Sequence, residues 1–177
     1  AALVAARAQR PGLILLAGEA GIGKTRTAEE FLERARSQGC MAIDSRCHES
    51  EGAPAFSPWL QIVRATFEHC ASIAALEELE PLQARLAPFL SDSSDRASSD
   101  SPSLTTHDPQ APRFRLFDGV TRLLERAAAS QPLVLMIDDL HRADPASLRL
   151  LQFVIRDLRN AAILINGTYR RTGQSPD

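Results

Sequence analysis

Short apolar runs alternate along this chain with longer segments of helical periodicity. The runs predict four strands, at residues 13–17, 40–46, 133–137 and 161–165, and the second of these has the weakest pattern. Apolar positions three or four residues apart predict helices at residues 1–10, 25–36, 58–71, 73–87, 113–130 and 145–159. Because strands alternate with helices, we expect an α/β fold of three layers, in which a mainly parallel four-stranded sheet carries helices on both faces.

Glycine, proline and capping residues set the ends of the predicted helices. Pro11-Gly12 should stop the first helix, Gly39 should be the C′ residue of the second, and the fourth should end before Pro88. Ser57 and Asp144 each precede a proline and are predicted N-caps. Two helices carry an apolar stripe suited to core packing. The stripe positions are Ala28, Phe31, Leu32 and Ala35 in the first and Phe114, Phe117, Val120, Leu124 and Ala128 in the second.

Residues 91–112 interrupt this pattern. Ser, Asp and Pro dominate the segment, and large apolar side chains are almost absent from it. Such a composition cannot offset the entropy of ordering, so we expect a flexible surface loop inserted in one domain. A phosphorylated linker is the alternative interpretation.

The eight residues from Gly18 to Thr25 fit the spacing G-x-x-x-x-G-K-[ST] of a phosphate loop. An apolar strand precedes them and a helix follows, so backbone N–H groups and the helix dipole would face a phosphate. Lys24 would contact the β- and γ-phosphates of a nucleotide, and the Thr25 hydroxyl would bind Mg²⁺. The predicted nucleotide-binding residues are Gly18, Glu19, Ala20, Gly21, Ile22, Gly23, Lys24, Thr25 and Arg26.

A second candidate element is the acid pair Asp138-Asp139 at the end of the apolar run 133–137. Carboxylates in that position are costly without a cation, and ligands of parallel sheets bind beside the carboxyl ends of strands. We therefore expect Asp138 to bind Mg²⁺ directly or through water, and Asp139 to orient or deprotonate the attacking water. Taken alone, this pattern also fits a plain solvated strand end.

A polar or basic residue after the last apolar run would lie next to the γ-phosphate. Arg170 is the candidate for such a sensor, and Arg171, Thr168 and Asn166 compete with it. His141 could contact the γ-phosphate or a neighbouring subunit, or it could be an ordinary loop residue.

Composition narrows the function classes. The hydrophobic fraction of 44% and the net charge of −2 fit one globular domain over residues 1–177 and give no basis for direct nucleic-acid binding. No apolar run approaches the roughly 20 residues that would span a membrane. Cys40, Cys47 and Cys70 have neither disulfide nor zinc-site spacing, so we expect reduced thiols in a cytoplasmic protein.

Several segments resemble the signal-transduction ATPases with numerous domains (the STAND class), which are AAA+-like P-loop NTPases. They are GEAGIGKTR, RCHESEGAPAFSPWLQ, RFRLFD, PLVLMIDDLHRADPASLRLLQF and ILINGTYR, and the resemblance covers about residues 11–170. It implies a P-loop NTPase core that binds ATP and Mg²⁺, with slow hydrolysis used as a switch. Lys24, Asp139 and Arg170 would be its catalytic residues, with Walker A and Walker B motifs at the phosphate loop and the acid pair.

The resemblance is closest to bacterial regulators in which the ATPase precedes a tetratricopeptide-like array. The output domain is often a LuxR-type helix-turn-helix, a winged helix, a cyclase or a kinase. Partners would then be a helical lid, the array, the output domain and, through nucleotide-dependent self-association, further copies. Many relatives have Trp where this chain has Arg142. The adenine-contacting segment and the lid are absent, so we expect this piece of a longer protein to bind ATP poorly by itself.

Three other functions compete with a regulatory ATPase. A small-molecule P-loop kinase would need an acceptor pocket and an arginine-bearing lid. An interaction module would bind ATP only as a structural ligand, without significant turnover. A DNA-remodelling ATPase fits poorly with the near-neutral charge.

Overall fold

The predicted strands form one parallel sheet in the computed structural model, which describes residues 2–48, 55–73, 79–90 and 111–170. The strands are β1 (Gly12–Gly18), β2 (Met41–Arg46), β3 (Leu133–Asp138) and β4 (Ile163–Arg170). Their order in the sheet is β1-β4-β3-β2, and each neighbouring pair is parallel. The expected α/β fold is confirmed, and β4 lies between β1 and β3.

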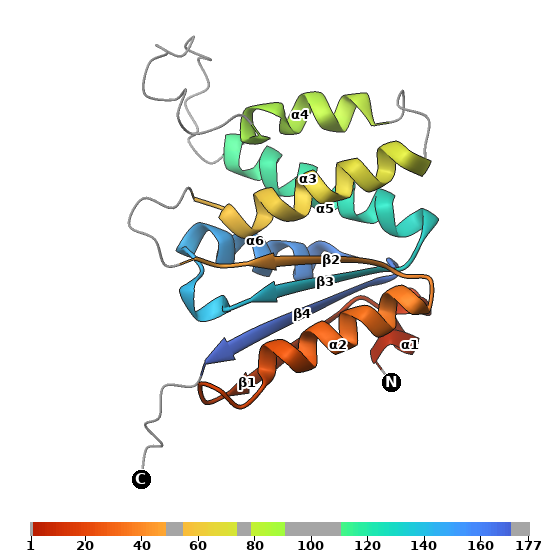
Figure 1. The fold of residues 1–177 in the computed structure, drawn as a ribbon. Helices are drawn as coiled ribbons and strands as arrows, with labels where there is room; N and C mark the ends of the chain where they lie inside the picture. Colours follow the sequence, from red (N-terminus) through yellow and green to blue (C-terminus); the bar gives the residue numbers. More distant parts are fainter. Residues whose placement is uncertain (1, 49–54, 74–78, 91–110, 171–177) are drawn as a thin grey trace.

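Helices cover both faces of this sheet (Figure 1). One face carries α1 (Ala2–Arg7) and α2 (Lys24–Ser37), and the other carries α3 (Ser57–Ile73), α5 (Ala111–Ser130) and α6 (Pro145–Asp157). A further helix, α4 (Glu80–Leu90), packs against α3 and α5, and a 3₁₀ turn, η3 (Leu140–Arg142), connects β3 to α6. Within the described residues, no helix has the length and apolar character needed to cross a membrane.

Burial of β3 on both faces explains its continuous apolar run. All six residues of the strand are buried. Val134 and Met136 pack in the cluster formed with α1 and α2, whereas Leu133, Leu135 and Ile137 pack in the cluster formed with α3, α5 and α6. This alternation is typical of a central strand in a parallel sheet. It leaves the Asp138 end of β3 at the sheet edge where β1 also ends.

The helix expected at residues 73–87 lies further along the chain. It continues to Leu90 with Pro88 inside it, so the prediction that Pro88 ends this helix is wrong. A proline removes one helical hydrogen bond. Directly after it, however, Phe89 is buried and packs edge-on against Phe56, with 5.7 Å between ring centroids. We infer that burial of this ring holds the last turn in place beyond the proline.

Part of the expected loop at residues 91–112 is helical. Residues 111–112 belong to α5, while 91–110 lie outside the described residues. The predicted apolar stripe of α5 is buried except for Phe114, which is 59% exposed. Phe114 lies in the first turn, at the margin of the core, where its ring packs edge-on against Phe153 at 5.7 Å.

The polar tail of β4 continues the strand beyond the expected end at residue 165. β4 extends to Arg170, which pairs in register with Gly18 at the end of β1. Asn166 and Thr168 are polar but buried within it. Because the prediction stopped at the first polar residue, it missed the half of the strand that reaches the site.

Helix ends follow the local chemistry closely. Gly39 has a φ of 75° directly after α2, as a C′ glycine should. Asp144 Oδ1 accepts a hydrogen bond from the backbone N–H of Ser147 at 2.9 Å, which confirms it as the N-cap of α6. Ser57, expected just before α3, is its first helical residue.

Candidate functional site

The phosphate loop connects the end of β1 to the start of α2. Gly21 and Gly23 have φ angles of 80° and 94°, in the left-handed region that a Cβ disfavours. A Cβ on Gly18 would lie 3.1 Å from Cγ2 of Ile22, so the turn is also tight around this glycine. Backbone N–H groups before the first turn of α2 are thereby available to an anion, which fits a phosphate-bearing ligand.

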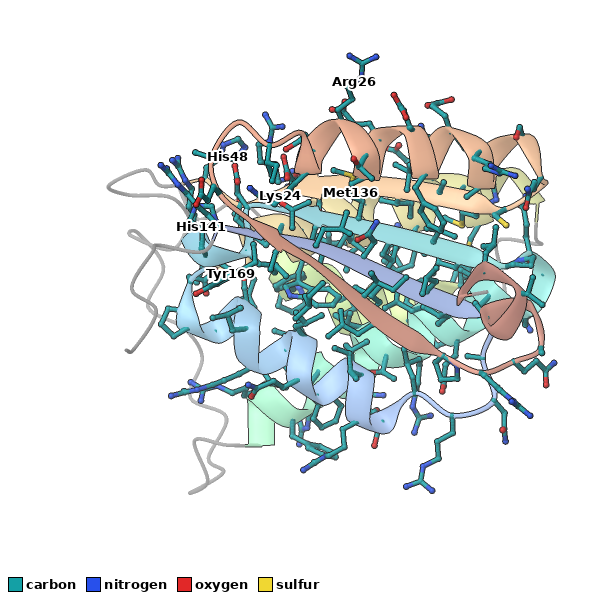
Figure 2. The ribbon with its side chains drawn as sticks, turned by 90° about the horizontal axis from the view of Figure 1, so that it is seen from below. Lys24, Arg26, His48, Met136, His141 and Tyr169 are labelled. Carbon is teal, nitrogen blue, oxygen red and sulfur yellow. The ribbon has the colours of Figure 1, made fainter. Side chains whose placement is uncertain are left out.

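Lys24, the first residue of α2, folds back over this loop. Its Nζ donates hydrogen bonds to the carbonyl oxygen of Gly18 at 3.0 Å and to that of Glu19 at 2.7 Å. Arg26 behaves differently, because its side chain is 84% exposed, pairs with Glu30 at 3.1 Å and points away from the strand ends (Figure 2). The Lys24 ammonium therefore lies beside the phosphate position, whereas Arg26, which lines the same end of α2, extends into solvent.

Thr25 and Asp138 meet at the carboxyl end of the sheet. The Thr25 hydroxyl donates to the carboxylate of Asp138, at 3.2 Å from Oδ1 and 3.4 Å from Oδ2. Asp138 is 2% exposed. Hydroxyl and carboxylate oxygens are the ligands that Mg²⁺ prefers, so this donor pair fits the expected metal. Thr25 and Asp138 are the residues that would hold it.

One hydroxyl, that of Thr168 on β4, gives the two acids different environments. It donates to Oδ1 of Asp138 and accepts from the backbone N–H of Asp139 at 2.9 Å. Burial disfavours the charged form of Asp138, but hydrogen bonds from Thr168 and Arg46 outweigh this effect and lower its pKa. Asp138 therefore stays ionised, as a metal ligand must.

Asp139 begins η3 in a left-handed backbone conformation. Its φ is 58°, which Asp tolerates better than most residues. The side chain is 35% exposed, and His141 Nδ1 lies 3.9 Å from its Oδ1. His141 in turn packs edge-on against Tyr169, with 6.1 Å between ring centroids. A solvent-accessible carboxylate in this position is suited to accept a proton from water.

An open hollow of about 400 Å³ joins the phosphate loop to Asp139 and His141. Figure 2 shows Lys24, His141 and Tyr169 at the same end of the sheet. The residues that line the hollow are Ala20, Gly21, Gly23, Lys24, Thr25, Arg26, Asp139, His141, Arg142 and Arg170. The hollow therefore brings together the phosphate loop, Asp139 and several cationic groups, and the buried Asp138 adjoins it through its contact with Thr25.

Among the candidates for a sensor, Arg170 lines this hollow. Asn166 is instead buried in the sheet, with no hydrogen-bond partner for Oδ1 among the described residues. Thr168 is bonded to Asp138. Arg171 lies outside the described residues. The position of Arg170 makes a sensing role feasible, and that role stays a prediction.

Sequence reasoning missed Arg46, the last residue of β2. Its guanidinium donates to Oδ2 of Asp138 from Nη2 at 2.8 Å and from Nε at 3.1 Å. Arg46 lies directly opposite Asp138 in the register between β2 and β3. A lone basic residue at the end of a weakly patterned strand gave no signal, because chain order does not reveal which strand is its neighbour.

Comparison with known proteins places these residues in a family. No curated protein matches the chain significantly. The sequence model of the AAA ATPase domain matches residues 1–165 and so includes the phosphate loop and both acids, whereas Arg170 follows the matched region. Together with the parallel sheet and the phosphate loop, this match shows that the chain belongs to the AAA ATPase domain family and is a nucleotide-binding core.

Proposed function

We propose that this chain, as part of a multidomain signalling protein that regulates transcription, binds ATP with Mg²⁺ and hydrolyses it slowly as the switch of that protein. The observation that carries the proposal is the contact between Thr25 and Asp138, 3.2 Å apart at the mouth of the phosphate loop. It joins the two motifs that the chemistry requires and that lie far apart in the sequence.

Nucleotide binding would depend on the loop and on Lys24. The N–H groups before α2 would surround the phosphates, and the Lys24 ammonium would exchange its two carbonyl partners for phosphate oxygens. Bound Mg²⁺ would neutralise charge on the phosphates. Thr25 and Asp138 would hold that ion in place, which would fix the orientation of the γ-phosphate.

Hydrolysis would depend on Asp139 and Arg170. The partly exposed carboxylate of Asp139 would orient a water and accept its proton, since it is not tied by the Thr168 hydroxyl as Asp138 is. Arg170 lines the same hollow from the end of β4 and would report the γ-phosphate. A movement of β4 in response to the γ-phosphate would reach both β1 and β3, because β4 pairs with both strands. Such a movement would supply the switch.

The regulatory part of the proposal rests on the resemblance to signal-transduction ATPases. A helical lid, a tetratricopeptide-like array and an output domain in the same longer protein would receive the signal. Nucleotide-dependent self-association follows from the same resemblance, whereas a cytoplasmic location is proposed from the reduced thiols expected of Cys40, Cys47 and Cys70.

Two substitutions, made in the full-length protein, test the proposal. Lys24→Ala should weaken ATP binding strongly in a fluorescence titration, and equal affinity in the variant and the wild type would refute nucleotide binding at this loop. Asp139→Asn should keep ATP binding but abolish phosphate release, because Asn tolerates the same backbone conformation and cannot accept the proton. A protein that uses ATP only as a structural ligand would be little changed by this second substitution.

A further inference from the structure

Arg46 binds the carboxylate that the expected metal ion would also need. Both contacts of the Arg46 guanidinium go to Oδ2 of Asp138, while Oδ1 accepts hydrogen bonds from Thr25 and Thr168. Both oxygens of Asp138 thus already accept hydrogen bonds. A carboxylate oxygen that binds a divalent cation would bring that cation next to the guanidinium, and the two positive charges would repel each other.

The Arg46 side chain has room to leave. It is 52% exposed, so it can reorient without disturbing the core. A second hollow, of about 450 Å³, adjoins Asp138 on the side of α2 and β2, and Arg46 lines it together with the acidic side chains of Glu29, Glu33 and Asp44. Glu29 is the carboxylate of this hollow toward which a displaced guanidinium can turn, because Glu33 and Asp44 already pair with Arg36.

We propose that Arg46 is a positioning residue that holds the carboxylate of Asp138 in the absence of metal and leaves Oδ2 when Mg²⁺ binds with the nucleotide. The displaced guanidinium would move into the hollow between α2 and β2, away from the phosphate loop. Nucleotide binding would thus be signalled to β2, which is at the opposite edge of the sheet from β1. This inference rests on the proposed function, because it needs Mg²⁺ and nucleotide at the site.

The test is the Mg²⁺ dependence of nucleotide affinity in the full-length protein. A fluorescent non-hydrolysable ATP analogue is titrated in Mg²⁺ and in EDTA. The dissociation constant in EDTA is divided by the dissociation constant in Mg²⁺, and this ratio is compared between variants. Arg46→Gln should increase this ratio by about fivefold, the effect expected when one charge-assisted pair no longer competes. Arg36→Gln is the matched control, because Arg36 lines the same hollow but pairs with Glu33 and Asp44.

An unchanged or smaller ratio in Arg46→Gln would overturn the inference. If that variant does not fold, the NMR signal of the Arg46 Nε–H in the wild-type protein provides the test. The signal is assigned by its loss in Arg46→Lys. The signal should shift when the analogue is added with Mg²⁺ and stay in place when it is added with EDTA. A signal that responds identically in both conditions overturns the inference while leaving nucleotide binding intact. A wild type that binds no analogue overturns the proposed function as well.

Discussion

The hydroxyl of Thr25 lies 3.2 Å from Oδ1 of Asp138, although 113 positions separate the two residues in the sequence. Thr25→Ala should therefore lower the contribution of Mg²⁺ to ATP affinity by about tenfold, as expected for one lost ligand of this type. Titrations with and without EDTA measure this contribution. Thr25→Ser keeps the hydroxyl and should behave as the wild type.

Thr27→Ala serves as the matched control for this experiment. Thr27 is on the same helical turn, and its hydroxyl donates to the carbonyl of Gly23 rather than to Asp138. If Thr27→Ala reduced the Mg²⁺ effect as much as Thr25→Ala does, the contact with Asp138 would not be the cause.

Two glycines with similar left-handed backbone conformations separate the effects of substitution on folding and on binding. Gly23 and Gly39 have φ angles of 94° and 75°, and a Cβ added to either has no neighbour within 4 Å. Alanine at either position should cost about 1 to 2 kcal/mol of unfolding free energy, measured by urea titration, because the conformation itself is unfavourable. Gly23→Ala alone should also weaken nucleotide binding, since Gly39 lies at the far end of α2. Equal binding by both variants would show that the loop conformation is unimportant.

The Thr168 hydroxyl should contribute more to stability than a typical buried threonine hydroxyl. Thr168→Val keeps the shape of the side chain but leaves a buried carboxylate oxygen and the N–H of Asp139 without this partner. The expected loss is about 2 to 3 kcal/mol in urea unfolding at pH 7. Thr121→Val is the control: Thr121 is equally buried, but its hydroxyl donates only to the carbonyl of Phe117 in its own helix. Similar losses for the two variants would contradict this prediction.

Cys47 should be unreactive in the folded protein. Burial, with the charges of Asp144, Asp139 and Asp138 adding to it, raises the pKa of this thiol from 9.0 to about 12. At pH 8 the folded state would hold about a thousandfold fewer Cys47 thiolates than the unfolded chain, so labelling by a thiol reagent should require unfolding.

The raised pKa of Cys47 also determines how the stability of the protein changes with pH. Because the folded pKa lies above the unfolded one, the unfolded state loses the Cys47 proton first as the pH rises. The free energy of unfolding should therefore be constant below about pH 8 for this group and fall between about pH 9 and 12. Cys47→Ala should flatten this part of the stability curve. Rapid labelling of Cys47 at pH 8 without denaturant would contradict the burial.

The sequence predicts most strands and helices of this molecule well, because continuous apolar runs and glycine spacing are local features. The strand before Gly18, the buried strand before Asp138 and the N-cap at Asp144 all follow from neighbouring residues. Proline was a less reliable guide: the burial of Phe89 overrides Pro88, and tertiary packing of this kind is invisible to a local rule.

Two contacts of the site that were not predicted, those of Arg46 and of the sensor candidate Thr168 with Asp138, depend on which strands are neighbours. Arg46 faces Asp138 only because β2 pairs with β3, and Thr168 reaches Asp138 only because β4 inserts beside β3. Both are polar residues that end or follow a hydrophobic pattern, where periodicity carries no information. The phosphate loop could be predicted as a motif, whereas the network that fixes the charge of Asp138 could not.

The position of β4 also determines when the site comes into existence during synthesis. β1 and β3 do not pair with each other, and β4, which joins them, follows both of them in the chain. A nascent chain that has emerged only through Asp138 therefore has a phosphate loop and an acid pair but no strand to hold them at a common edge. Since domains fold as their chain leaves the ribosome, we expect ATP to find its site only after residue 170 has emerged, because the order of the strands delays assembly of the site until then.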